Sequence, residues 1–120
     1  MATFTKNHLS GSTDGRMIKV AQTATAGTTI HTGSTTTTTF HEVWLYAVNS
    51  DTTDRKLTIE WGGTSSPDDL IELTVVAESG LVLVVPGLVL QGNATALVVR
   101  AFAATANVIS IAGYVNEITV

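Results

Sequence analysis

Short apolar stretches that alternate with a period of two residues, each bounded by turn residues, most limit how this chain can fold. The clearest is the segment 55–61, in which Leu57, Ile59 and Trp61 alternate with charged or polar residues. Successive side chains of a β-strand point to opposite faces, so this pattern predicts a strand with one buried and one polar face. No window carries an apolar stripe with the 3.6-residue period of a helix over three turns. The sequence therefore predicts an all-β protein.

Eight candidate strands follow one another along the chain. They are residues 16–22, 28–32, 40–48, 55–61, 70–76, 81–85, 95–103 and 108–119. Pro86-Gly87 and the segment 91–93 are expected to break the later strands. Strands of this number and spacing are typical of a β-sandwich, and eight is the number of a jelly roll. We predict a single-domain antiparallel β-sandwich, jelly-roll-like, over residues 16–120.

The first fifteen residues differ from the rest of the chain. Residues 1–15 are polar and rich in Gly, Ser and Thr, with Phe4 and Leu9 as large apolar side chains. This composition predicts a flexible N-terminal arm that lies outside the core and orders on binding a partner. The threonine run 35–39 is interpreted as an exposed loop that leads into the strand at Phe40.

Composition excludes several classes of protein. Charged residues make up 13% of the chain and the net charge is -4, which disfavours a nucleic-acid-binding domain. The chain holds no apolar run near the ~20 residues of a membrane span and no apolar leader at its N-terminus. The absence of cysteine excludes disulfides, thiolate zinc sites and cysteine nucleophiles, and it favours assembly in a reducing cytoplasm. We expect neither a nucleic acid nor a membrane as partner.

Residues that could carry chemistry are few. His8, His31 and His41 lack the spacing of a metal motif, and we expect them at solvent-exposed or edge-strand positions. Carboxylates gather at Asp51/Asp54, at Asp68/Asp69 with Glu72, and at Glu78, where calcium binding or acid–base catalysis is an alternative to ordinary acidic loops. Their spacing is unlike an EF-hand, and no GxSxG, P-loop or GxGxxG motif is present. We predict no catalytic, cofactor-binding or metal-binding residue, no cofactor and no enzymatic activity.

The aromatic residues allow two interpretations. Trp44, Tyr46, Trp61 and Tyr114 could form a platform on which a sugar stacks. Trp61, however, continues the apolar register of Leu57 and Ile59, so we expect it in the core.

Several strands are apolar on both faces, which is unusual for a monomeric sandwich. The segments 43–48 and 81–85 carry no charge, and the segment 95–103 carries one, at Arg100. Large apolar patches are uncommon on soluble monomers. This pattern predicts that part of an outer sheet face is buried between copies in a homo-oligomer; a hydrophobic monomer is the alternative.

From Phe40 to Val120, about two-thirds of its length, the chain resembles the capsid decoration (cement) proteins of tailed bacteriophages. The matching features are Trp44-Leu45-Tyr46, the segment 60–63 (EWGG), Pro67-Asp68-Asp69, Val85-Pro86-Gly87 and Arg100-Ala101. The resemblance implies a structural virion protein on the outer capsid surface that binds the major capsid protein, stabilises the shell and has no catalytic activity. It also implies a homotrimer, matching the three-fold axes of icosahedral shells.

A carbohydrate- or receptor-binding module of a phage tail or fibre is the alternative. Tryptophan and tyrosine side chains exposed together on a sheet face would favour glycan recognition, whereas burial of Trp44 and Trp61 would favour decoration. A major capsid gene beside this gene would also favour decoration.

Overall fold

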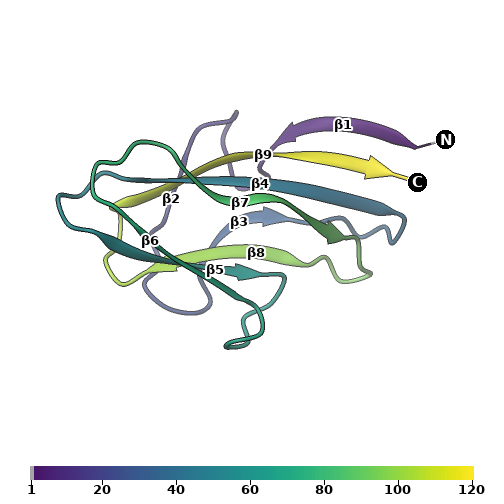
Figure 1. Ribbon diagram of the computed structural model, residues 1–120. Helices are drawn as coiled ribbons and strands as arrows, with labels where there is room; N and C mark the ends of the chain where they lie inside the picture. Colours follow the sequence, from purple (N-terminus) through teal and green to yellow (C-terminus); the bar gives the residue numbers. More distant parts are fainter. Residues whose placement is uncertain (1) are drawn as a thin grey trace.

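The computed structural model describes residues 2–120, which form two stacked antiparallel sheets and no helix (Figure 1). The strands are β1 (Thr3–His8), β2 (Ile18–Lys19), β3 (Thr28–Thr32), β4 (Thr39–Asn49), β5 (Arg55–Trp61), β6 (Leu70–Val75), β7 (Val82–Gln91), β8 (Val98–Ala103) and β9 (Ile109–Thr119). The predicted all-β antiparallel sandwich is confirmed. Within the same residues no helix has the length and apolar character needed to cross a membrane.

The strand order is that of a jelly roll. Sheet A has the order β1-β9-β4-β7, with the short β2 also paired to β9, and sheet B has the order β3-β8-β5-β6. The antiparallel pairs β2·β9, β3·β8, β4·β7 and β5·β6 are nested one inside the next along the chain. Such nesting is what results when a long hairpin rolls up into two sheets. The count is nine, one more than predicted, because residues 3–8 of the expected arm form β1, which pairs with β9.

The core lies between the sheets and follows the predicted alternation. Along β4 every second residue is buried, and Val43, Leu45 and Ala47 are fully buried. Leu57 and Ile59 of β5 meet them from sheet B. Trp61, which the sequence placed in the core, is partly buried and packs against it. The period-two alternation of the sequence therefore predicts correctly which residues of β4 and β5 face the core.

The polar face of β5 is also covered, contrary to the alternation. Thr58 and Glu60 point away from the core, yet they are 5% and 0% exposed. The loop between β2 and β3 folds over this side of sheet B, and its residues Thr25 and Gly27 hydrogen bond to Glu60. A loop distant in sequence thus buries a face that the strand's own pattern leaves polar.

Pro86-Gly87 does not end the strand that contains it. β7 continues to Gln91, and its register against β4 shifts twice, once at this dipeptide. β7 lies at the edge of sheet A, where one side needs no ladder hydrogen bond and proline is tolerated. The prediction of a break at residues 91–93 agrees with the end of β7.

The N-terminal segment contributes to the core, against expectation, through Leu9. Residues 3–8 form β1, whose six side chains are all exposed. Leu9 then turns inward and is 1% exposed. The expectation that this segment lies outside the core is therefore wrong for Leu9, while the flexibility of the arm stays a prediction.

Of the expected strand 16–22, Ile18–Lys19 forms β2. Residues 35–38 are exposed and lead into β4, as expected for a loop, but Thr39, also expected in this loop, begins β4 and is buried.

Candidate interaction surface

The outer face of sheet A is an apolar surface that faces away from the core. Its side chains come from the outward positions of four neighbouring strands, as the pairing register places them. We call this set the outer A face: Phe4, Phe40, Trp44, Tyr46, Leu83, Val89, Tyr114 and Ile118. Aromatic and aliphatic side chains in this arrangement are typical of protein contact surfaces.

A stacked row crosses the outer A face from one edge of the sheet to the other. The rings of Trp44 and Tyr114, cross-strand partners in β4 and β9, lie 5.9 Å apart between centroids at an interplanar angle of 13°. Lys6 of β1 places its Nζ 4.7 Å from the centroid of the Tyr114 ring. On the other side, a Cβ at Gly87 would lie 2.8 Å from Cζ2 of Trp44, so the indole rests on the glycine of β7. Each of the two rings is thus in contact with a residue of the strand on either side of its own.

One carboxylate, that of Glu42 in β4, lies among the residues of the outer A face, and its partners lie on the same side of the sheet. Oε1 of Glu42 accepts hydrogen bonds from Nε1 of Trp44 at 2.8 Å and from Nδ2 of Asn116 at 2.9 Å. These bonds, that from Trp44 foremost, hold the pKa of Glu42 below its usual value. Glu42 is therefore ionised at neutral pH, and its charge is stabilised by neighbours on the same sheet.

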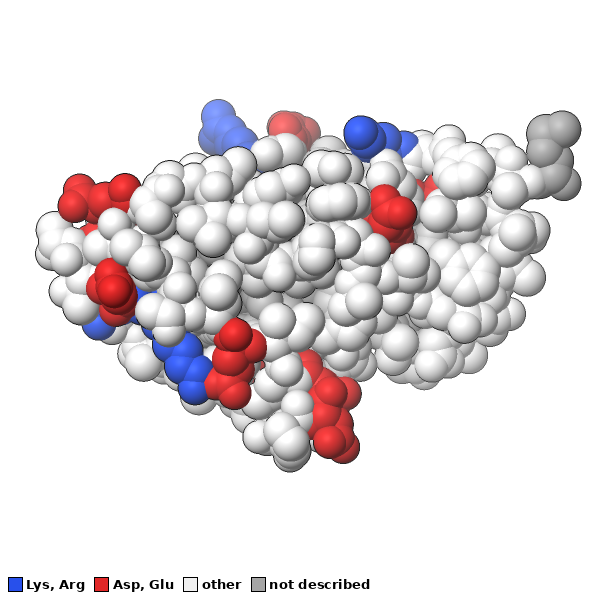
Figure 2. Space-filling model, viewed as in Figure 1, with Lys and Arg blue, Asp and Glu red and all other residues white. Residues whose placement is uncertain are grey.

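Apolar side chains continue from this face onto the β7 edge. Leu81, Leu83, Leu88 and Val89 are between 44% and 58% exposed. Figure 2 shows charged groups gathered along the left, lower and upper margins, while the area over β7 and the right-hand end is almost free of them. Residues 79–99 contain no Asp, Glu, Lys or Arg. The segments 43–48 and 81–85, which the sequence marked as apolar on both faces, thus have some side chains in the core and others on this surface. The segment 95–103 lies in sheet B, in β8 and the loop before it.

The four aromatic residues that could have formed a sugar platform do not lie together. Trp44, Tyr46 and Tyr114 share the outer A face and are half-buried, whereas Trp61 ends β5 in sheet B and packs on the core. Both faces of the Tyr114 ring are in contact, with Trp44 and with Lys6. A sugar that stacks on this ring would have to displace one of them.

Two histidines that were expected at exposed or edge positions are buried together. Nε2 of His31 in β3 lies 2.7 Å from Nδ1 of His41 in β4, and the backbone N–H of Ser10 donates to Nδ1 of His31 at 3.0 Å. Nε2 of His41 lies 3.2 Å from Oε2 of Glu117, without the alignment of a hydrogen bond. Burial, and then the neighbouring His41, lower the pKa of His31 to about 4. The expectation was therefore wrong for His41, which is buried on the central strand β4. It was correct for His8, which is exposed, and for the position of His31 on the edge strand β3, although that side chain is buried.

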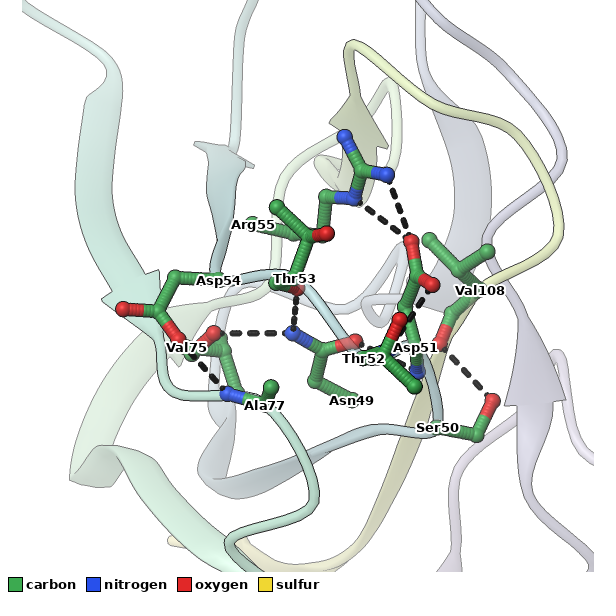
Figure 3. A network of polar contacts seen from close by, with 10 residues as sticks. All are labelled: Asn49, Ser50, Asp51, Thr52, Thr53, Asp54, Arg55, Val75, Ala77 and Val108. Atoms are coloured by element: carbon green, nitrogen blue, oxygen red, sulfur yellow. Dashed lines mark hydrogen bonds and ion pairs between the residues drawn. The ribbon is translucent and has the colours of Figure 1, made fainter.

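Four side chains of the acidic clusters have partners in turns or on a neighbouring strand. At the β4–β5 turn, Asp51 pairs with Arg55, and Asp54 accepts a hydrogen bond from the N–H of Ala77 at 2.9 Å (Figure 3). Asp69 accepts from the N–H of Ser65 at 3.0 Å, and Glu72 pairs with Lys56. Across residues 2–120, no group of three or more His, Cys, Asp or Glu side chains is placed to hold a metal ion.

Fold and surface together define an antiparallel β-sandwich domain of jelly-roll order with an apolar, aromatic outer face. Comparisons with protein-family models, with curated proteins and with solved structures found no match.

Proposed function

We propose that this protein is a structural virion protein that binds the outer surface of a phage capsid and stabilises the shell without catalysis. The sequence resemblance suggests this class, and one structural observation supports it. The outer A face and the β7 edge form a broad apolar surface whose carboxylate is already bonded within the face. Burying such a surface against a partner removes little unpaired charge from water, so the free-energy cost of desolvation is small.

The proposed assembly is a homotrimer in which the outer A face packs between copies. Closed cyclic symmetry buries an apolar patch without leaving an open end that could extend into a fibre. The choice of three copies follows from the family resemblance and from the three-fold axes of icosahedral shells. Three linked copies would each contact the major capsid protein, and multivalent attachment strengthens binding without stronger single contacts.

Light scattering coupled to size exclusion tests the assembly. We expect a mass near three times 12.6 kDa; a mass near 12.6 kDa at tens of micromolar would refute oligomerisation, and twice that value would refute the trimer alone. Val89→Lys places a charge on the outer A face and should produce monomers. Thr32→Lys, an exposed position in sheet B, adds the same charge and should leave the mass unchanged.

Attachment is tested with undecorated capsids of the phage that encodes the protein. We expect the wild-type protein to co-sediment with them and to raise the temperature at which the shells rupture. Co-sedimentation no greater than that of an unrelated β-sandwich of equal charge would overturn the proposal.

A carbohydrate- or receptor-binding module of a tail or fibre is the second candidate, favoured by the joint position of Trp44, Tyr46 and Tyr114 on one face. The stacking of Tyr114 between Trp44 and Lys6 disfavours it, because a sugar needs a free ring face. Binding to host surface polysaccharide that Tyr114→Ala abolishes would favour this second candidate.

A further inference from the structure

A hollow on the outer side of sheet B, away from the outer A face, has a carboxylate in its wall. It measures about 340 Å³ and lies between the β2–β3 loop and the β5–β6 loop, both of which lie below sheet B in Figure 1. Its lining residues are Thr23, Ala24, Thr25, Glu60, Thr64, Ser66, Leu70 and Phe102. The site thus combines one acid, four hydroxyls and an apolar part formed by an aromatic and a leucine.

The charge of Glu60 has hydrogen-bond donors but no cation to balance it. Its side chain is 0% exposed; Oε1 accepts from the N–H of Gly27 at 2.7 Å and Oε2 accepts from the hydroxyl of Thr25. In the described part of the chain, no Lys, Arg or His forms an ion pair with it, although Arg100 occupies the paired position on β8. Buried carboxylates are normally paired, and an ionised carboxylate can accept about four hydrogen bonds. Glu60 therefore keeps acceptor capacity for a charged donor.

The surroundings favour a cation over an anion. Asp68 and Asp69 lie in the same β5–β6 loop as Thr64 and Ser66, and Asp68 is exposed. The whole chain carries a net charge of -4. Like-signed charges around a hollow raise the local concentration of oppositely charged ligands. The hydroxyls of Thr23, Thr25 and Ser66 add neutral acceptors for N–H groups.

We propose that this hollow binds an alkylammonium group, with the ammonium at Glu60 and the aliphatic stem on Phe102 and Leu70. Long cationic side chains bury their methylene stems on apolar surface in the same way. The group is supplied either by a lysine side chain of a partner protein or by a free alkyl amine. This site is independent of the proposed assembly through the outer A face.

Titrations followed by amide NMR test the proposal, with Nα-acetyl-lysine methylamide standing for the side chain and n-butylammonium for the free amine. We expect saturable shifts at Thr25, Gly27 and Phe102 for at least one probe. If the lysine derivative binds more strongly, the natural ligand is a lysine side chain of a partner protein. If butylammonium binds equally or more strongly, the natural ligand is a free alkyl amine. The uncharged n-butanol should give no saturable shift. Equal shifts with n-butanol, or none with either amine at tens of millimolar, would overturn the proposal.

Two variants localise the effect. Glu60→Gln keeps an acceptor for Gly27 and removes the charge, so it should weaken binding about tenfold or more. Glu72→Gln removes an exposed acid from the neighbouring β6 and should leave the affinity within about twofold. If Glu60→Gln does not fold, Phe102→Ala, which removes the half-buried ring that supports the stem, should weaken binding of both amines. Unchanged affinity in a folded Glu60→Gln or Phe102→Ala variant would overturn the proposal.

Discussion

Nε2 of His31 lies 2.7 Å from Nδ1 of His41, and this buried imidazole pair joins the two sheets of the sandwich. Because the N–H of Ser10 donates to Nδ1 of His31, the proton of neutral His31 is on Nε2 and points at His41. Nδ1 of His41 is then the acceptor, and its own proton is on Nε2, beside Glu117. A further proton on either ring would set two donors against each other.

Acid should therefore destabilise the protein through His31. Its pKa is 6.5 in the unfolded chain and about 4 in the folded one, so between these pH values the unfolded state holds more protons. The contribution of neutral His31 to the free energy of unfolding is fully present above pH 6.5 and is lost as the pH falls through 4. The total loss is about 3 kcal/mol at most. Urea unfolding at pH 7, 6, 5 and 4 measures it.

Variants separate His31 from the other titrating groups. His31→Gln should be less stable at pH 7 but should flatten the decline between pH 6.5 and 4. His8→Gln, which removes an exposed histidine, should retain the wild-type decline. If the free energy of unfolding falls equally steeply with pH in His31→Gln and in the wild type, protonation of His31 does not cause the decline.

Gly87 and Gly80 offer a matched test of the stacked row. Their φ angles are +77° and +76°, but an added Cβ would lie 2.8 Å from Trp44 at Gly87 and would meet nothing within 4 Å at Gly80. Gly80→Ala should cost about 1 kcal/mol, for backbone strain alone. Gly87→Ala should cost roughly 1–3 kcal/mol more, because the indole must move. Chemical unfolding and Trp fluorescence measure both; equal losses would mean that the indole moves freely.

The strands with regular alternation could be predicted closely from sequence. The prediction for residues 55–61 matches β5, and that for residues 28–32 matches β3. Alternation records which face of a strand meets the core of its own sandwich. It holds no information on the β2–β3 loop that later covers Glu60, so the burial of that carboxylate could not be predicted.

The candidate surface was predictable in part. The uncharged segment 43–48 indicated that β4 has apolar side chains on both faces, as it does. The contacts of Trp44 with Tyr114 and Gly87 depend on the register of three strands far apart in sequence. The His31–His41 pair likewise requires β3 and β4 to face each other across the core, which local patterns do not specify.

Asn49 should be the most sensitive residue of the β4–β5 turn. It is 1% exposed, and its Nδ2 donates to the carbonyls of Thr53 and Val75 at 3.0 and 2.9 Å. Asn49→Ala leaves these carbonyls without their donor and should cost about 2 kcal/mol. Ser50→Ala removes an exposed hydroxyl bonded to Val108 and should cost less than about 0.5 kcal/mol. Urea unfolding compares the two, and a smaller loss for Asn49→Ala than for Ser50→Ala would contradict this assignment.

In the N-terminal segment, we expect Leu9 to contribute to stability and the residues before it to contribute little. β1 exposes all six of its side chains, so deleting residues 2–7 should leave thermal stability nearly unchanged. If the proposed attachment to a capsid holds, the same deletion should weaken it. Leu9 is 1% exposed in the core, so Leu9→Ala should cost about 2–4 kcal/mol. Phe4→Ala is the control, since Phe4 is 71% exposed and its loss should change stability by less than about 0.5 kcal/mol.

Calorimetry of four variants tests this: the two point variants, the deletion of residues 2–7 and a longer deletion of residues 2–12. Because a deletion through residue 12 also removes Leu9, it should lower the melting temperature by several degrees relative to the deletion of residues 2–7. If the shorter deletion melts as early as the longer one, the ladder between β1 and β9, rather than the Leu9 side chain, holds this segment in place. If neither deletion lowers the melting temperature, burial of Leu9 does not stabilise the protein, and the prediction is wrong.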